Sequence, residues 1–267
     1  MFCGEVDFSE TQFHDGDTVA NEEVNFKNAL FKNKTNFSSV DFPHSNFTAS
    51  TFQSEAIFNK VIFRNRVLFD RCEFKGKTIF KEARYADDAD YSDTKFAGEV
   101  HFDGAEFRGG NGIDNESLSL ENTHFEHGAQ FRHVQFQDLN GRQLVSGKNI
   151  DFSKCVFNDS VVLSDCDIDG QLLATKSVFG NIKSRDTVLV IDGCDISGEV
   201  NFTDAWISGI DSSNGSFGSD VIFTETWFDD SVKFNQASFS QQANFDHVTF
   251  DSTADFSDCE FTRLANF

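Results

Sequence analysis

The chain has 267 residues, of which 34 are Phe, two are Trp and one is Pro, a bias that is typical of a repeat protein rather than of an ordinary globular domain. Its 44 acidic residues outnumber 22 basic ones and give a formal net charge of -22, which argues against direct binding of nucleic acid or of an anionic membrane. The sequence has no apolar run long enough for a membrane span and no signal peptide at its start, so we expect a cytoplasmic protein.

A large apolar residue recurs at alternating steps of five and six residues along most of the chain. The pattern covers 1–13, 24–107, 123–136, 150–168 and 194–267. A smaller residue stands two places before each large one, as Ala243 does before Phe245, and the residue between them is typically polar, such as Asn244. Two steps therefore make an 11-residue unit.

This unit does not fit a helix. At about 100° per residue, a step of five moves the next large residue roughly 140° around a helix, so the large residues would lie on two distant faces. In an extended chain, residues two apart point to the same side, so the small and the large residue both face inward. The residues between, rich in Ser, Asp, Asn and Gly, suit corners. Four such sides predict a coil of about 22 residues, stacked on its neighbours at about 4.8 Å.

The unit small–polar–Phe–polar–polar resembles the pentapeptide-repeat family. Examples are "ANFDH" at 243–247, "ADFSD" at 254–258 and "CEFKG" at 72–76. The resemblance implies an all-β fold, a right-handed quadrilateral β-helix, or solenoid, of about 22 residues per coil. It also implies a protein-binding module, and some members are DNA mimics that bind type II topoisomerases such as gyrase.

Four interruptions are expected in a single solenoid domain over 1–267. Irregular loops or bulges should lie near 14–23, 108–122, 137–149 and 180–190. In the first two, Val19, Ile113 and Leu120 can fill coil sides. In 137–149, Leu139 and Leu144 are off register and indicate a bulge, whereas 180–190 cannot be placed in the pattern at all.

Cysteine and metal motifs do not indicate a chemical site. Of the six cysteines, only Cys3 points outward, and five occupy the inward small position, where a thiol acts as a compact apolar group: Cys72, Cys155, Cys166, Cys194 and Cys259. The segment "DCDIDG" at 165–170 begins like an EF-hand loop, but Lys176 stands where the twelfth-position Glu is required. His101 and His124 would stack on adjacent coils, a weak pattern for a metal. With no catalytic motif present, we predict no enzyme activity, cofactor or metal.

Charge is distributed unevenly along the chain. Residues 59–84 hold eight basic residues against three acidic ones, a net charge of +5. This basic belt consists of Lys60, Arg64, Arg66, Arg71, Lys75, Lys77, Lys81 and Arg84. Residues 187–267 hold 14 acidic residues against two basic ones, about one net charge per 1.5 Å of axis, close to duplex DNA. The candidate acidic interaction surface there consists of Asp229, Asp230, Asp246, Asp251, Asp255 and Asp258.

These patterns predict a non-catalytic protein-binding or scaffold module whose protein partner is unknown. An acidic DNA mimic that binds a type II topoisomerase and a structural spacer in a larger assembly stay open as alternatives, and solubility or a salty habitat would also explain the acidic residues. The pattern runs from Phe2 to Phe267. Either the chain therefore belongs to a longer protein, or its ends pair, as in an end-to-end homodimer.

Overall fold

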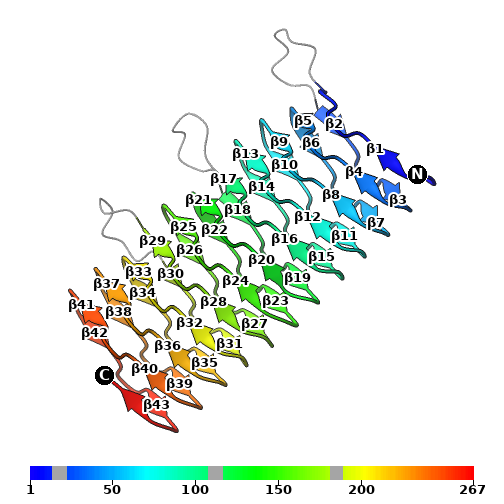
Figure 1. Ribbon diagram of the computed structural model, residues 1–267. Helices are drawn as coiled ribbons and strands as arrows, with labels where there is room; N and C mark the ends of the chain where they lie inside the picture. Colours follow the sequence, from blue (N-terminus) through cyan, green and yellow to red (C-terminus); the bar gives the residue numbers. More distant parts are fainter. Residues whose placement is uncertain (14–22, 108–116, 181–188) are drawn as a thin grey trace.

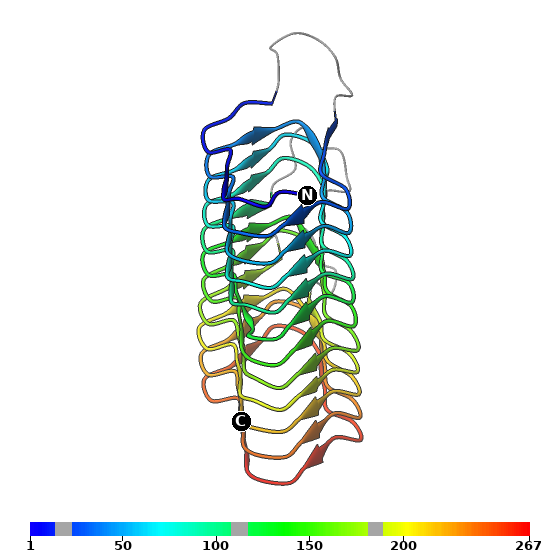
Figure 2. The same ribbon diagram turned by 90° about the vertical axis from the view of Figure 1, so that its right-hand side faces the viewer.

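The computed structural model describes residues 1–13, 23–107, 117–180 and 189–267. In these residues the chain winds through four parallel sheets in a fixed order. From β2 onward neighbouring strands of a sheet are four places apart in the chain, and β1 pairs with β4. We number the sheets I to IV in the order in which the chain visits them within one coil. The coils stack in one direction, with the N- and C-termini at opposite ends of the stack (Figures 1 and 2).

The strands of each sheet are two or three residues long. Sheet I contains β1 (Val6–Asp7), β4 (Thr35–Asn36), β8 (Ala56–Ile57), β12 (Thr78–Ile79), β16 (Val100–His101), β20 (Ala129–Gln130), β24 (Ile150–Asp151), β28 (Leu172–Leu173), β32 (Val200–Asn201), β36 (Val221–Ile222), β40 (Ala243–Asn244) and β44 (Ala265–Asn266). Sheet II contains β5 (Asp41–Phe42), β9 (Ile62–Phe63), β13 (Arg84–Tyr85), β17 (Glu106–Phe107), β21 (Gln135–Phe136), β25 (Val156–Phe157), β29 (Val178–Phe179), β33 (Trp206–Ile207), β37 (Trp227–Phe228) and β41 (Thr249–Phe250).

The other two sheets complete the square. Sheet III contains β2 (Glu23–Asn25), β6 (His44–Asn46), β10 (Val67–Leu68), β14 (Ala89–Asp90), β18 (Ser117–Ser119), β22 (Asp138–Asn140), β26 (Val161–Val162), β30 (Leu189–Val190), β34 (Ile210–Asp211), β38 (Val232–Lys233) and β42 (Ala254–Asp255). Sheet IV contains β3 (Leu30–Phe31), β7 (Thr51–Phe52), β11 (Glu73–Phe74), β15 (Lys95–Phe96), β19 (His124–Phe125), β23 (Val145–Ser146), β27 (Asp167–Ile168), β31 (Asp195–Ile196), β35 (Ser216–Phe217), β39 (Ser238–Phe239) and β43 (Glu260–Phe261). The described residues contain no helix long and apolar enough to cross a membrane.

The strand register confirms the predicted coil of about 22 residues. In sheet I, Ala56 pairs with Thr78 and Thr78 pairs with Val100, each 22 residues further along the chain. The large residues stack inside the coil, as Phe52 does on Phe74 with ring centroids 4.7 Å apart and planes 5° from parallel. Both side chains are at most 1% exposed. The predicted all-β solenoid with inward-facing Phe is therefore confirmed.

The corners that follow sheets I and III are β-turns with a left-handed residue. The N–H of Ala29 donates to the carbonyl oxygen of Phe26 at 2.9 Å, and the intervening Asn28 has a φ of 57°. Among the residues that the structure describes, twenty non-glycine residues share this conformation, with φ between 55° and 61°. Where the residue before the large one is Asn or Asp, it supports the turn, because a side-chain oxygen such as Oδ1 of Asn25 accepts the N–H of Lys27 at 2.9 Å.

On sheets II and IV, Cys and Ser side chains at the inward small position donate hydrogen bonds to backbone carbonyl oxygens. The Cys72 thiol donates to the carbonyl oxygen of Phe47 at 2.9 Å, one coil earlier, and the Ser177 hydroxyl donates in the same way to Phe152 at 2.7 Å. Cys72, Cys155, Cys166 and Cys194 are buried and Cys3 is exposed, as predicted. Burial raises the pKa of the Cys72 thiol to about 12, so this thiol is inert at neutral pH.

The interruptions differ from the prediction in one place. Residues 137–149, predicted to bulge, form two ordinary sides of the coil with β22 and β23, and Leu139 and Leu144 are 1% and 0% exposed. The physical reason is an exchange of sizes: the two leucines occupy the inward small position, and Gly141 occupies a Phe position. A Cβ on Gly141 would meet Cδ2 of Leu163 at 2.7 Å, so a neighbouring leucine fills the vacated space.

The other three interruptions fall largely outside the described residues. These residues, 14–22, 108–116 and 181–188, all connect sheet II to sheet III, and they include the predicted fillers Val19 and Ile113. The flanking parts are regular: β2 begins at Glu23, β30 begins at Leu189, and Leu120 is fully buried at the large position that follows β18. That 1–267 form a single domain stays a prediction.

Candidate functional site

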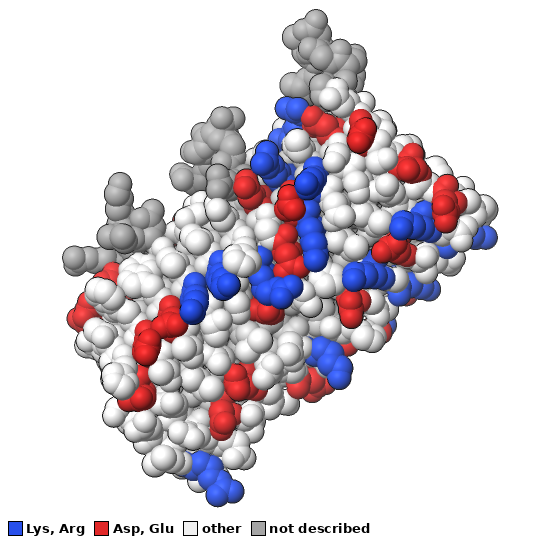
Figure 3. All heavy atoms as spheres, in the orientation of Figure 1, with Lys and Arg blue, Asp and Glu red and all other residues white. Residues whose placement is uncertain are grey.

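The basic belt is paired with carboxylates throughout. The pairs are Lys60–Glu82, Arg64–Asp41, Arg66–Asp90, Arg71–Asp70, Lys75–Glu73, Lys77–Glu99, Lys81–Asp103 and Arg84–Glu106. Five of these carboxylates lie outside residues 59–84 and come from neighbouring coils, because residues about 22 apart are adjacent in the stack. They balance the +5 counted along the chain. Figure 3 accordingly shows basic and acidic side chains interleaved in the N-terminal half, on the face that is in view.

The six predicted acidic residues do not share one face. Asp229, Asp230 and Asp251 lie at the corner between sheets II and III, and Asp246 lies at the corner between sheets I and II. Asp255 is in β42 on sheet III, and Asp258 follows it at the next corner. Four of the six therefore flank sheet II, whereas the other two face elsewhere.

Both tryptophans of the chain lie on the outer surface of sheet II. Trp206 in β33 and Trp227 in β37 are partners in the parallel register, one directly above the other. Trp227 is 49% exposed, and the other large apolar side chains that are exposed among the described residues, Met1, Leu264 and Phe267, lie in the first and last coils. The indole Nε1 of Trp227 donates to Oδ2 of Asp251 at 2.9 Å, which fixes one edge of the ring.

An apolar column extends the tryptophan pair along the stack. Val156 in β25, Val178 in β29 and Trp206 are successive register partners on the outside of sheet II, and each is partly exposed. Figure 1 shows β25, β29, β33 and β37 side by side along one edge of the molecule. Three spacings of about 4.8 Å make this column about 14 Å long.

Acidic residues border the tryptophan end of the column on both sides. Asp204, Glu225 and Asp246 lie on the turns that enter sheet II, and Asp229, Asp230 and Asp251 lie at the corner that leaves it. In the described residues, Oδ2 of Asp204 lies 3.7 Å from Nζ of Lys176, and Oδ2 of Asp246 lies 3.0 Å from Nδ1 of His247. No ion pair is recorded there for the other four. We call the apolar column with these six acids the tryptophan face.

A separate polar network occupies sheet I and the corner after it. Arg132 donates from Nε to Oδ1 of Asp103 at 2.9 Å and from Nη2 to Oε1 of Gln130 at 2.8 Å. The same Gln130 oxygen lies 3.0 Å from Nδ1 of His101, which is 7% exposed. Burial raises the pKa of Asp103, but Arg132 and Lys81 outweigh it, so the pKa lies below its ordinary value.

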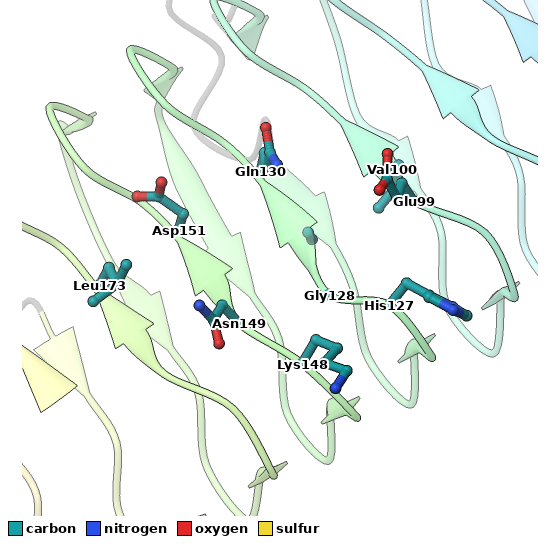
Figure 4. A pocket seen from close by; sticks show the side chains of 10 residues that line it. Glu99, Val100, His127, Gly128, Gln130, Lys148, Asn149, Asp151 and Leu173 are labelled. Carbon is teal, nitrogen blue, oxygen red and sulfur yellow. The ribbon is translucent and has the colours of Figure 1, made fainter. Parts of the chain in front are cut away.

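Two hollows of about 310 Å³ each adjoin this network. The first lies over sheet I, with Gly128 beside Asn149 and with Glu99, Lys148 and Asp151 at its border (Figure 4). The second is lined by Lys81, Asp103, Arg132, His133, Ser153 and Lys154. Both hollows are lined by acidic and basic side chains. Asp103 in one coil already binds Arg132 in the next, so this polar network connects neighbouring coils.

The histidines expected to stack are separated. His101 in β16 lies between Ile79 and Gln130 on sheet I, whereas His124 in β19 lies on sheet IV. The prediction was wrong because it assumed two sides within 108–122, whereas β18 is the strand that follows β17. Within the described ranges, no three His, Cys, Asp or Glu side chains converge to hold a metal.

Comparison with known proteins agrees with the repeat pattern. The family model "Pentapeptide repeats", in nine copies, matches residues 58–106. Residues 58–106 are therefore pentapeptide repeats. Among solved structures, the chain is similar to HetL, a pentapeptide-repeat protein involved in heterocyst differentiation regulation from the cyanobacterium Nostoc sp. strain PCC 7120. The two are 13% identical, with 96% of this chain and 90% of that chain covered and a TM-score of 0.31. No curated protein sequence matches the chain.

The tryptophan face was not predicted from the sequence. The position before each large residue was treated as outward and polar, and the two exceptions, Trp206 and Trp227, were not examined. The signal was available, because the two residues are 21 apart, close to one coil, and precede the large residues Ile207 and Phe228. Outward residues one coil apart are neighbours in any parallel solenoid.

Proposed function

We propose that the protein is a non-catalytic protein-binding module that engages its partner through the tryptophan face. The observation that carries the proposal is the adjacent pair Trp206 and Trp227 on the outside of sheet II, with Trp227 half exposed. A solenoid has large inward positions that bury aromatic side chains, so the fold itself does not require an outward indole. Tryptophan is the residue most enriched at the energetic centres of protein interfaces. We place the protein in the cytoplasm as part of the same proposal, since its six free thiols suit a reducing compartment.

Peptide selection tests this proposal without assuming a partner. A displayed library of random peptides is panned on the full chain, and the recovered peptides are measured against Trp227→Ser and against Asp195→Ser. Asp195 is an exposed outward residue of β31 on the opposite sheet IV and serves as the matched control. We expect peptides that lose binding to Trp227→Ser and keep it with Asp195→Ser. Peptides that bind all three chains equally, or a failure to recover any, would refute a binding role for this face.

An acidic DNA mimic that binds a type II topoisomerase is the second candidate. The 14 acidic residues against two basic ones in 187–267 support it. The test is a supercoiling assay with a bacterial enzyme at low and high salt, repeated with Asn at positions 229, 230, 246, 251 and 255. Inhibition that fades with salt and with neutralisation would favour mimicry, because salt screens exposed charges. Absence of inhibition at every concentration would remove this candidate.

The spacer and the end-to-end homodimer are further proposals. Leu264 and Phe267 are each 68% exposed, and an end-to-end contact would cover these apolar side chains. Light scattering of the full chain, compared with Leu264→Ser, tests the homodimer: a dimer mass that falls to the monomer mass in the variant supports it, and a monomer in both refutes it.

A further inference from the structure

We infer that the tryptophan face binds a basic amphipathic helix of its partner, lying along the axis of the solenoid. This inference rests on the proposed function and adds the chemistry of the partner. It draws on three features of the face: an apolar column, acidic borders on both sides of the tryptophan end of that column, and a length that fits a short helix.

The charges select a basic partner. The borders of the face contribute six carboxylates. In the described residues, only two of them contact a basic side chain: Asp204 contacts Lys176, and Asp246 contacts His247. Glu225 and Asp251 are exposed, so they are accessible to a lysine or arginine without displacing a cation of the chain. An acidic partner would instead face like charges on both borders, which opposes association. Charge complementarity also makes binding strong at low salt and weaker when salt screens the exposed charges.

The order of acidic and apolar residues across the face is complementary to the cross-section of an amphipathic helix. Crossing sheet II from one corner to the other, the surface is acidic at Glu225, apolar at Trp227 and acidic again at Asp229. A basic amphipathic helix has the complementary cross-section, with an apolar stripe between two flanks of lysine and arginine. The exposed part of the Trp227 ring also offers its π surface to a flanking cation.

The length of the face fits two to three helical turns. The column from Val156 to Trp227 spans three strand spacings, about 14 Å. At about 1.5 Å per residue, roughly nine helical residues cover it, with apolar anchors at positions i, i+3, i+4 and i+7. A helix laid across the strands would meet the acidic corners with its apolar stripe, so the axial direction is favoured.

The two tryptophans make the face directly measurable. They are the only ones in the chain, so the tryptophan emission of the full protein arises wholly from this face. The probe is a synthetic 14-residue helical peptide without Trp or Tyr, with leucine along one stripe and lysine and arginine on both flanks. One control peptide has the same composition in an order that abolishes the stripe, and a second has glutamate in place of each cation.

Two triple variants separate this face from bulk acidity. Asp229→Asn, Asp230→Asn and Asp251→Asn neutralise one border of the face. Asp167→Asn, Asp169→Asn and Asp195→Asn remove the same charge from exposed positions on and beside the opposite sheet IV. All six side chains lie outside the buried core, and circular dichroism checks that each variant is folded.

We expect the basic amphipathic peptide to shift the tryptophan emission and both control peptides to bind at least tenfold more weakly. The border variant should weaken binding at least tenfold, whereas the sheet IV variant should change it less than twofold. Equal weakening by the two variants, or equal binding of the reordered peptide, would overturn the inference. Failure of the basic peptide alongside Trp227-dependent peptides from the random library would overturn the partner chemistry but not the binding role. If the basic peptide does not bind and the library yields no Trp227-dependent peptide, both the partner chemistry and the binding role of this face are overturned.

Discussion

Gly104 and Gly128 both have left-handed backbone conformations, with φ of 70° and 77°, yet the structure predicts different costs for replacing them by alanine. Gly104 stands at the turn position where the other coils hold 20 non-glycine residues, among them Ala49 with φ of 56°. A Cβ on Gly104 would meet only Cγ of Glu82, at 3.6 Å, which is ordinary contact. A Cβ on Gly128 would lie 2.2 Å from the backbone oxygen of Asn149 in the next coil.

The magnitudes follow from these surroundings. A non-glycine residue in the left-handed region loses about 1–2 kcal/mol, and the reduced freedom of the unfolded chain returns about 0.4–1 kcal/mol, so Gly104→Ala should destabilise by about 1 kcal/mol. Gly128→Ala carries the same backbone term, and the stacked coils must also separate locally to admit the methyl group. Overpacking of this kind adds about 1–3 kcal/mol, so we expect a total of about 2–4 kcal/mol. Gly104→Asn should be milder than Gly104→Ala, since Asn tolerates the left-handed region.

Urea unfolding followed by far-ultraviolet circular dichroism measures the three variants against the wild type. A solenoid gains its stability from contacts between neighbouring repeats, so the slope of each transition must be compared before free energies are extracted. If Gly128→Ala is as mild as Gly104→Ala, the close approach of the coils at Asn149 is not a real constraint. If Gly104→Ala is as damaging as Gly128→Ala, the turns do not accept side chains as freely as the 20 non-glycine examples indicate.

Three further predictions concern the core and the charges. Ala243→Phe should destabilise badly by overpacking, whereas Asp255→Ser on the exposed surface should cost far less, because a serine oxygen can still accept the N–H of Ser257 that Asp255 accepts at 2.9 Å. Equal losses in urea titrations would contradict the assignment of inward and outward positions. Tyr85→Phe should cost about 1–3 kcal/mol, because it leaves the buried Tyr91 hydroxyl without its partner at 2.8 Å, and the double change to Phe should recover most of the loss; a double variant as unstable as the single one would contradict this. Burial and a neighbouring carboxylate raise the pKa of Asp138, so ionising it opposes folding, and this penalty develops as the pH rises through its folded pKa. Asp138→Asn should therefore stabilise the protein at pH 7 by less than about 1 kcal/mol and have no effect at a pH below the ordinary aspartate pKa. Urea titrations that give the same difference in unfolding free energy between variant and wild type at these two pH values would refute this prediction.

The fold could be predicted because the period of the repeat determines the geometry of the coil. Two inward residues per side follow from the period of an extended chain, and the recurrent Phe marks the side on which the core lies. The prediction was wrong at 137–149 because Leu139 and Leu144 exchange roles with small residues such as Gly141. A pattern that follows the largest residue loses register at such an exchange.

The candidate site was harder to predict, because charge was counted along the chain and not through the stack. Once a coil of about 22 residues is assumed, residues 22 apart should be paired, and Lys60–Glu82, Lys77–Glu99 and Lys81–Asp103 all have this spacing. The same reasoning predicts that the basic belt is neutral. The acidic borders of sheet II depend in addition on which corner each residue occupies, which requires the positions of the interruptions.

The four sheets also differ in whether their outward residues support the turns of the fold. On sheets I and III, outward Asn and Asp residues such as Asn25 and Asn244 accept a backbone N–H of the following turn. The strands of sheets II and IV are followed by corners of a different kind, where the outward residues have no such task and range from Lys95 and Asp195 to Trp227. Substitutions at these outward positions change the surface without disturbing a turn. Selection for a partner therefore acts most freely on sheets II and IV, and the two tryptophans stand on sheet II, where the fold itself does not require an aromatic residue.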